Sequence, residues 1–169
     1  MKKNLTLTGM MGVGKSTVGK ALSKHLSMEF IDIDKVIEKK LKSTIQNIFE
    51  QKGESFFRKL EEKITLEEIR KNNKIISLGG GAFMNKKIRD CVLSHTKSFW
   101  LNLNTDRLAK RLNNSKKRPL LISKNIKTTI EKIYGERKSS YSLANYKIDC
   151  NNLSADLIVN KIVKIYEKD

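Results

Sequence analysis

Apolar residues fall along the chain in two alternating patterns. Short runs of strand-forming residues are typical of buried strands, and longer segments with apolar residues three and four apart are typical of helices that cover a sheet. The short runs predict strands over residues 4–8, 30–32, 74–78, 98–103 and 146–150. The helical spacing predicts helices over 15–26, within 35–51, over 54–70, 86–93, 105–112 and 126–143, and a closing helix with the stripe Leu153, Leu157, Ile158, Ile162 and Ile165.

This alternation predicts a three-layer α/β fold, with a parallel five-stranded sheet and helices on both of its faces. The 169 residues contain no internal repeat and no linker-like segment, so we expect one domain over 1–169. Trp100 lies in an apolar run and is expected in the core.

A glycine-rich segment separates the first predicted strand from the first predicted helix. Residues 9–17, Gly-Met-Met-Gly-Val-Gly-Lys-Ser-Thr, fit G-x-x-x-x-G-K-[ST], the phosphate-binding P-loop. Glycine lets the backbone bring its N–H groups close to phosphate, and the helix N-terminus adds further donors. The alternative is a simple glycine-rich turn. We expect ATP to be bound by Gly12, Val13, Gly14, Lys15, Ser16 and Thr17, with Lys15 on the β- and γ-phosphates and Ser16 on Mg²⁺.

Composition limits the other partners. The net charge of +17 comes from 28 lysines and seven arginines against 18 acidic residues, and the lysines are spread along the whole chain. Nucleic-acid binding proteins gather such charge in a stripe, often with aromatic residues between, so we expect no nucleic-acid partner. No apolar run approaches the roughly 20 residues that span a bilayer. The first apolar segment is broken by polar residues and glycines, and no cleavage site follows, so we expect no membrane partner and a cytoplasmic location.

The loops that follow the predicted strands are where ligands of parallel sheets bind. Asp32 and Asp34 follow the second strand; on an extended backbone they would point the same way, one toward Mg²⁺ and one toward a substrate hydroxyl. Either can instead be a helix N-cap. The third strand carries Ser77 where many P-loop enzymes have the Mg²⁺ aspartate, which leaves Asp32 for that role. Three glycines follow, Gly79 to Gly81, and indicate close approach to a ligand or a plain loop.

The chain resembles the shikimate kinase family over nearly its whole length. The resemblance rests on the order and spacing of six motifs. They are the P-loop, Asp32-x-Asp34, Gly53-Glu54-x-x-Phe57-Arg58-x-x-Glu61, Ser77-Leu78-Gly79-Gly80-Gly81-Ala82, Arg118-Pro119-Leu120-Leu121 and Arg137-x-x-x-Tyr141.

The resemblance implies a P-loop NTPase fold similar to nucleoside monophosphate kinases, with a substrate-binding subregion at about 33–61 and a mobile lid at about 112–125. It implies a monomer that transfers the γ-phosphate of ATP to the 3-hydroxyl of shikimate, with Mg²⁺ as cofactor. In the family the aspartate matching Asp34 contacts the substrate hydroxyls as base or positioning group, and the arginines matching Arg58 and Arg137 hold the carboxylate. The glycines matching Gly79, Gly80 and Gly81 offer backbone to the substrate, Asp32 resembles the residue near Mg²⁺, and Arg118 on the lid contacts ATP and, with Lys15, offsets charge on the phosphoryl group.

Some alternatives remain at this stage. Glu61 and Glu62 follow Arg58 at helical spacing, so a glutamate can orient the guanidinium, or Arg58 can be a mere surface ion pair. The predicted lid can be a solvated loop. A gluconate kinase of the same fold is the rival enzyme, and a nucleotide-dependent nucleic-acid binding protein is the rival of another class. The segment 151–153 lacks an arginine that some family members place near the adenine.

Overall fold

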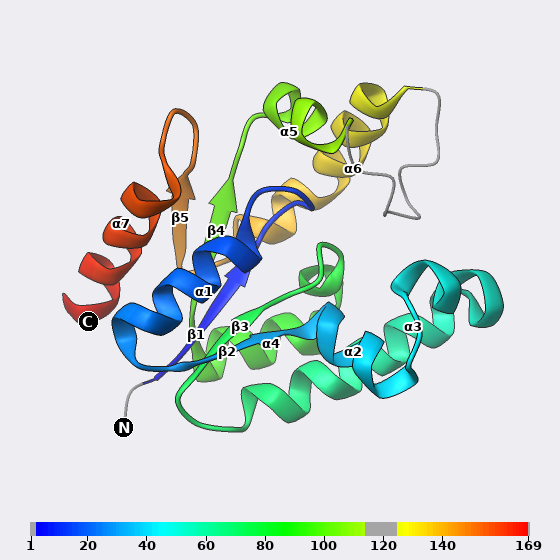
Figure 1. Cartoon of the computed structure of the whole chain (residues 1–169), viewed down its shortest axis with the longest axis horizontal. Helices are drawn as coiled ribbons and strands as arrows, with labels where there is room; N and C mark the ends of the chain where they lie inside the picture. Colours follow the sequence, from blue (N-terminus) through cyan, green and yellow to red (C-terminus); the bar gives the residue numbers. More distant parts are fainter. Residues whose placement is uncertain (1–2, 114–124, 169) are drawn as a thin grey trace.

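Five parallel strands form one sheet, which the computed structural model describes together with the rest of residues 3–113 and 125–168. The order across the sheet is β2-β3-β1-β4-β5, with every neighbouring pair parallel. The first strand therefore lies in the middle, between β3 and β4 (Figure 1). The bounds are β1 (Asn4–Thr8), β2 (Glu29–Asp32), β3 (Lys74–Ser77), β4 (Thr96–Asn102) and β5 (Tyr146–Asp149).

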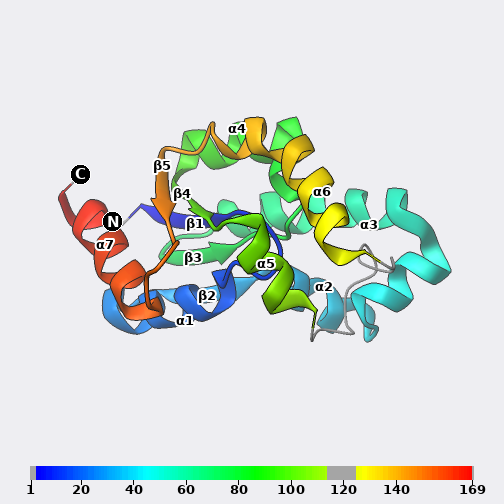
Figure 2. The ribbon, with the colours of Figure 1, turned by 90° about the horizontal axis from the view of Figure 1, so that it is seen from above.

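Helices cover both faces of this sheet. One face carries α1 and α7, which pack against each other, and the other carries α4, which packs on β4 and on α3 (Figure 2). Helices α5 and α6 pack together beyond the carboxyl ends of the strands (Figure 1). The bounds are α1 (Lys15–Leu26), α2 (Ile33–Leu41), α3 (Ile45–Ile69), α4 (Lys86–His95), α5 (Thr105–Leu112), α6 (Ile126–Tyr141) and α7 (Ala155–Lys168), with a short 3₁₀ turn η1 (Ala82–Met84).

The core follows from this layering. Strands covered on both faces are buried on both sides, because each of their side chains meets a helix, although small polar side chains such as Thr6 and Ser98 are among the buried ones here. Leu5, Ile75 and Phe99 are accordingly fully buried on three adjacent strands, and Trp100 is buried as expected. The three-layer α/β fold with a parallel five-stranded sheet is confirmed. No helix within the described residues combines the length and the apolar character that crossing a bilayer requires.

One detail of the helices confirms the sequence prediction and another differs from it. The predicted break between residues 51 and 54 is confirmed, because α3 consists of two helical segments that meet at a kink, where Gly53 adopts the non-helical φ 78° and ψ 166°. Leu157, predicted in the apolar stripe of the last helix, is about half exposed. The other apolar residues of α7 cover only the edge of the sheet, and Leu157 lies beyond that contact. The stripe itself is confirmed at Ile158 and Ile162, which are buried.

The kink at Gly53 generates a prediction about stability. Its backbone conformation is open almost only to glycine, and a Cβ there would meet nothing within 4 Å, so the cost of Gly53→Ala is purely backbone strain, about 1–3 kcal/mol. Gly135 is the matched control, since it lies within α6 with equally open surroundings. Gly135→Ala is expected to stabilise by up to about 1 kcal/mol. Urea unfolding of both variants measures the difference, and changes of the same sign would contradict the strain at Gly53.

Candidate functional site

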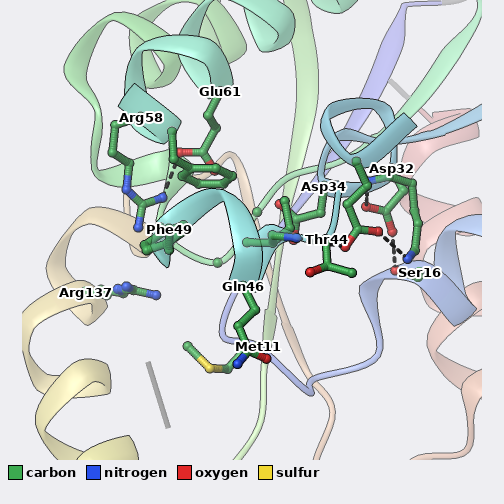
Figure 3. A pocket seen from close by; sticks show the side chains of 17 residues that line it. Met11, Ser16, Asp32, Asp34, Thr44, Gln46, Phe49, Arg58, Glu61 and Arg137 are labelled. Carbon is green, nitrogen blue, oxygen red and sulfur yellow. Dashed lines mark hydrogen bonds and ion pairs between the residues drawn. The ribbon is translucent and has the colours of Figure 1, made fainter. Parts of the chain in front are cut away.

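A cavity of about 560 Å³ opens where the strands end. Its walls come from the P-loop, α2, both segments of the kinked α3, the loop after β3, and α6 (Figure 3). A smaller hollow of about 240 Å³ lies beside it over the P-loop. Four residues line both spaces, so the two adjoin: Ser16, Asp32, Asp34 and Gly80.

The P-loop forms the floor of the smaller hollow. Gly12 and Gly14 have φ of 77° and 107°, which glycine alone adopts readily, and α1 begins directly after Gly14 with no side-chain cap. Lys15 is buried, and its Nζ donates to the carbonyl oxygens of Gly9 at 2.8 Å and Met10 at 3.0 Å. The hollow therefore combines a helix N-terminus with a buried ammonium group, which suits an anion. Ser16 and Thr17 also line it, whereas the side chain of Val13 is packed in the core.

Asp32 connects the end of β2 to this hollow. It accepts a hydrogen bond from Ser16 Oγ at 2.6 Å, and its other oxygen accepts from the N–H of Lys35 as the N-cap of α2. The alternative N-cap role is confirmed, and the same carboxylate still reaches Ser16, so the expected metal role stays a prediction. A hydroxyl and a carboxylate side by side are hard oxygen donors, and Mg²⁺ is commonly held by one or two such groups together with phosphate oxygens. The residues present therefore fit Mg²⁺ bound to a nucleotide.

Asp34 reaches the cavity by a different route from the one expected. The condition for Asp32 and Asp34 to point the same way, an extended backbone, is not met, because the N-cap at Asp32 starts α2 already at Ile33. Asp34 lies in the first turn of that helix and still lines both spaces. Figure 3 shows its carboxylate between the Ser16–Asp32 pair and the glutamate of α3.

Arg58 is fixed on the far side of the cavity by two glutamates of its own helix. Its Nη1 donates to Glu61 Oε2 at 2.8 Å, and its Nε and Nη2 donate to Glu54 Oε1 at 3.2 and 3.1 Å. Glu61 is 1% exposed and Arg58 lines the cavity, so the interpretation of Arg58 as a mere surface ion pair is wrong. Glu62 instead binds Asn85 and Lys87 outside the cavity.

Arg137 faces Arg58 from α6 across the opening (Figure 3). Its Nη1 is buried and has no hydrogen-bond partner among the described residues, and the same holds for Glu61 Oε1. Buried polar atoms nearly always have partners, so an unmatched guanidinium nitrogen in a cavity wall is evidence for an anionic ligand there.

The glycine triplet provides the space for these charged groups. A Cβ on Gly79 would lie 2.5 Å from Glu61 Oε1 and 2.9 Å from Asp34 Oδ1, and one on Gly81 would lie 2.7 Å from Arg58 Nη2. Side chains of α2 and α3 therefore lie close to this loop, and larger residues at these two positions would displace three charged groups. Close approach of the loop to a ligand stays a prediction.

Burial changes the acidity of Glu61. Burial raises the pKa of Glu61 above its ordinary 4.5, against the opposing charge of Arg58, and the nearby Asp34 carboxylate raises it further. Burial and Asp34 therefore favour the neutral form of Glu61, and Arg58 favours its charged form.

Several lining residues were missed by the sequence analysis. Met11 of the P-loop and a group from the start of α3 line the cavity without carrying charge: Thr44, Ile45, Gln46 and Phe49. The sequence signal that could have found them was Phe49, which lies one helical turn before Gly53. In the structure its ring packs on the ring of Phe57, with the two ring centroids 4.7 Å apart. Arg118 and residues 114–124 of the predicted lid lie outside the described residues.

Comparisons with known proteins agree on one family. A family model described as shikimate kinase matches residues 11–167. The shikimate kinase of Sulfurihydrogenibium sp. is 42% identical over 95% of this chain and 96% of its own, and that of Bacillus subtilis is 39% identical over 96% and 88%.

Solved structures agree with the sequence comparisons. Shikimate kinase from Acinetobacter baumannii in complex with shikimate superposes with a TM-score of 0.95 at 31% identity, over 98% of this chain and 93% of that one. A gluconokinase from Sinorhizobium meliloti has a TM-score of 0.60 at 12% identity, over 99% and 93%, which is a likeness of fold alone.

The raised pKa of Glu61 predicts a pH dependence of stability. A folded-state pKa above the unfolded value makes the contribution of Glu61 fully present below pH 4.5 and lost as pH rises through the folded pKa. Wild-type protein should therefore lose stability relative to Glu61→Gln as pH rises from 4.5 to neutrality. Urea unfolding at a series of pH values measures this.

Glu62 is the matched control one residue away. Its pKa is lowered by the hydrogen bond from Asn85 and by Lys87, so raising the pH should not weaken wild-type protein relative to Glu62→Gln. Parallel pH curves for wild-type and Glu61→Gln would show that Glu61 is not held above its ordinary pKa.

Proposed function

The chain belongs to the shikimate kinase family and phosphorylates shikimate with ATP, and from this we propose how its own residues perform the reaction. The observation that carries the proposal is the division of the cavity: two guanidinium groups lie at one end, and Asp34 lies at the other, beside the P-loop (Figure 3). A substrate with a carboxylate on one side of a ring and hydroxyls on the other fits this division.

The guanidinium end orients the substrate. Arg58 and Arg137 line the same opening from α3 and α6, and planar guanidinium groups bind carboxylates with paired, directional hydrogen bonds. We propose that the substrate carboxylate lies between them, with the backbone of Gly79, Gly80 and Gly81 along its side. The unmatched Nη1 of Arg137 gains an acceptor in this arrangement.

The other end carries out the phosphoryl transfer. With the carboxylate held by the arginines, the ring hydroxyls point toward Asp34, which accepts the proton of the 3-hydroxyl or fixes its direction as that oxygen attacks the γ-phosphate. Lys15 and Arg118 offset the negative charge on the transferring group. The 3-hydroxyl oxygen forms a bond to the γ-phosphorus and loses its proton, while the bond from the γ-phosphorus to the β–γ bridging oxygen breaks. The products are shikimate 3-phosphate and ADP.

Ser16 Oγ and the Asp32 carboxylate would hold Mg²⁺, whose contribution is to neutralise charge on the β- and γ-phosphate oxygens. Both side chains line the hollow over the P-loop, next to the donors of the α1 N-terminus. Their hydrogen bond keeps both oxygens directed to the same point before the nucleotide arrives.

We also propose that the enzyme works as a cytoplasmic monomer with no nucleic-acid partner. One chain supplies every wall of the described cavity, so a second copy is not needed to complete it. Residues 33–61, which form α2 and the first part of α3, act as the substrate-binding subregion, and 112–125 act as the lid of a single domain.

The reaction is tested by measuring ADP release from MgATP with shikimate, quinate or gluconate. We expect strong stimulation by shikimate alone, loss of turnover in Lys15→Ala and Asp34→Asn, and loss in EDTA that added Mg²⁺ reverses. Stimulation by gluconate instead of shikimate would overturn the substrate, and stimulation by nucleic acid would favour a nucleotide-dependent binding protein.

The carboxylate clamp predicts a selective loss of substrate affinity. Replacing either arginine by lysine keeps the charge and removes the planar fork, so Arg58→Lys and Arg137→Lys should raise the KM for shikimate at least about tenfold and leave the KM for ATP unchanged. Arg70→Lys is the control, because Arg70 is exposed at the end of α3 away from the cavity. Equal effects on both substrates would contradict the clamp.

A further inference from the structure

Tyr141 joins the two halves of the site without lining the cavity. It is the last residue of α6, one helical turn after Arg137, and it is fully buried. Its hydroxyl donates a hydrogen bond to the carbonyl oxygen of Gly80 and lies 3.9 Å from the sulfur of Met10. A single hydroxyl group thus contacts the glycine loop after β3 and the P-loop after β1.

The glycine loop needs such a contact. Gly80 lies between two other glycines, and a peptide flanked by glycines rotates with little steric resistance. Gly80 is half-buried, and a carbonyl withdrawn from water needs a partner. Tyr141 supplies the donor, and together with the hydrogen bond from the N–H of Ala82 to the Gly79 carbonyl at 3.1 Å it holds the direction of the peptide between Gly80 and Gly81.

The direction of that peptide matters for the substrate carboxylate. The C=O and N–H of a trans peptide point to opposite sides, so a carbonyl held by Tyr141 directs the N–H of Gly81 away from Tyr141. A Cβ on Gly80 would lie 3.4 Å from Arg137 Nη1, so the same peptide also sets how close the guanidinium can come. The backbone donor and the cation are therefore positioned together.

The ring of Tyr141 is held firmly enough to serve as an anchor. It stacks on Trp100 of β4 with ring centroids 6.0 Å apart and an angle of 28° between the planes. Trp100 is paired in the sheet with Thr8, the last residue of β1 before the P-loop. Burial raises the pKa of Tyr141 above its ordinary value, which keeps the hydroxyl protonated and able to donate.

We propose that Tyr141 is a positioning residue for recognition of the substrate carboxylate: its hydroxyl fixes the Gly80–Gly81 peptide against Arg137. The proposal rests on the function proposed above, in which Arg137 and this loop hold the carboxylate. Tyr141 itself does not line the nucleotide hollow, so loss of its hydroxyl should affect binding of shikimate more than binding of ATP.

The test removes the hydroxyl alone. Tyr141→Phe should raise the KM for shikimate about five- to tenfold while kcat and the KM for ATP stay within about twofold. The methyl ester of shikimate, which lacks the charged carboxylate, should be turned over equally by wild-type enzyme and variant, so that the preference for the free acid falls by the same five- to tenfold. Placing 4-aminophenylalanine at position 141 restores a donor and should return the shikimate KM toward wild type.

Tyr134→Phe is the matched control. Tyr134 lies two turns earlier on α6, and its hydroxyl donates to the Asn102 side chain at 2.9 Å, outside the cavity. It should lower thermal stability by an amount similar to Tyr141→Phe without changing the preference for the free acid.

Three results would overturn the proposal. The first is an equal loss of activity on shikimate and on its methyl ester, and the second is a rise in the KM for ATP that matches the rise for shikimate. The third is a Tyr141→Phe protein that fails to fold while the 4-aminophenylalanine protein folds, because the hydroxyl would then be a requirement of folding. Failure of the proposed function is separate, because it would show as wild-type enzyme that does not turn over shikimate.

Discussion

The parallel pairing of β1 with β3 is the contact on which the whole site depends. Leu7 pairs with Ser77, and the N–H of Leu78 donates to the Leu7 carbonyl at 3.1 Å as the two strands end. The P-loop and the glycine loop therefore leave the sheet side by side, close enough that a Cβ on Gly80 would lie 3.4 Å from the backbone nitrogen of Met11. A slip of one residue would move one loop about 3.3 Å against the other and reverse the faces of the strand. The distance between the P-loop and the glycine loop is thus set by backbone hydrogen bonds between the strands.

Charge burial is the second constraint, and it explains why the site needs its ligand. Glu61, Lys15 and part of Arg137 are withdrawn from water, and a buried charge is costly unless it is paired and hydrogen-bonded. Lys15 donates to P-loop carbonyls and Glu61 Oε2 accepts from Arg58, but Glu61 Oε1 and Arg137 Nη1 have no hydrogen-bond partner among the described residues. An anion that supplies the missing acceptor removes this cost. Part of the free energy of ligand binding therefore comes from pairing a donor that is left unpaired in the folded protein.

The fold could be predicted from sequence because its strongest signals are local. Strands buried on both faces are short apolar runs, and the P-loop has a fixed spacing, so all five strands and the start of α1 were predicted within about two residues. The start of α2 was predicted two residues late, near residue 35, because sequence alone left open whether Asp32 caps the helix. The break at Gly53 was predicted, and the structure adds the φ of this residue, which sequence does not show.

The contacts within the site were harder to predict from sequence, because many of them join residues far apart in the chain. The pairing of Arg58 with Glu61 follows helical spacing and was foreseen, although the second glutamate, Glu54, lies at the equivalent position one turn before and was overlooked. The Tyr141–Gly80 bond joins residues 61 positions apart, and the Arg137–Gly80 approach is equally remote. Periodicity tells which face of a helix is buried and does not tell which backbone group it meets, so such contacts require the three-dimensional structure.

The arginines of this lysine-rich chain are related to both constraints, the positions of the loops and the burial of charge. Within residues 3–113 and 125–168, Arg89 donates to the carbonyls of Phe83 and Met84 at the end of the glycine loop, and Arg111 donates to those of Gly12 and Val13 in the P-loop. Arg58 and Arg137 lie in the cavity wall between them. A guanidinium carries five donors in one plane, so it can bridge two carbonyls or two carboxylate oxygens where an ammonium group on a flexible stem would serve one point. Four arginines of the described residues thus lie at a loop or in the cavity wall, whereas Arg70 and Arg107 are exposed. An arginine at the first four positions can hold a group in a defined orientation, which the charge of a lysine alone does not provide.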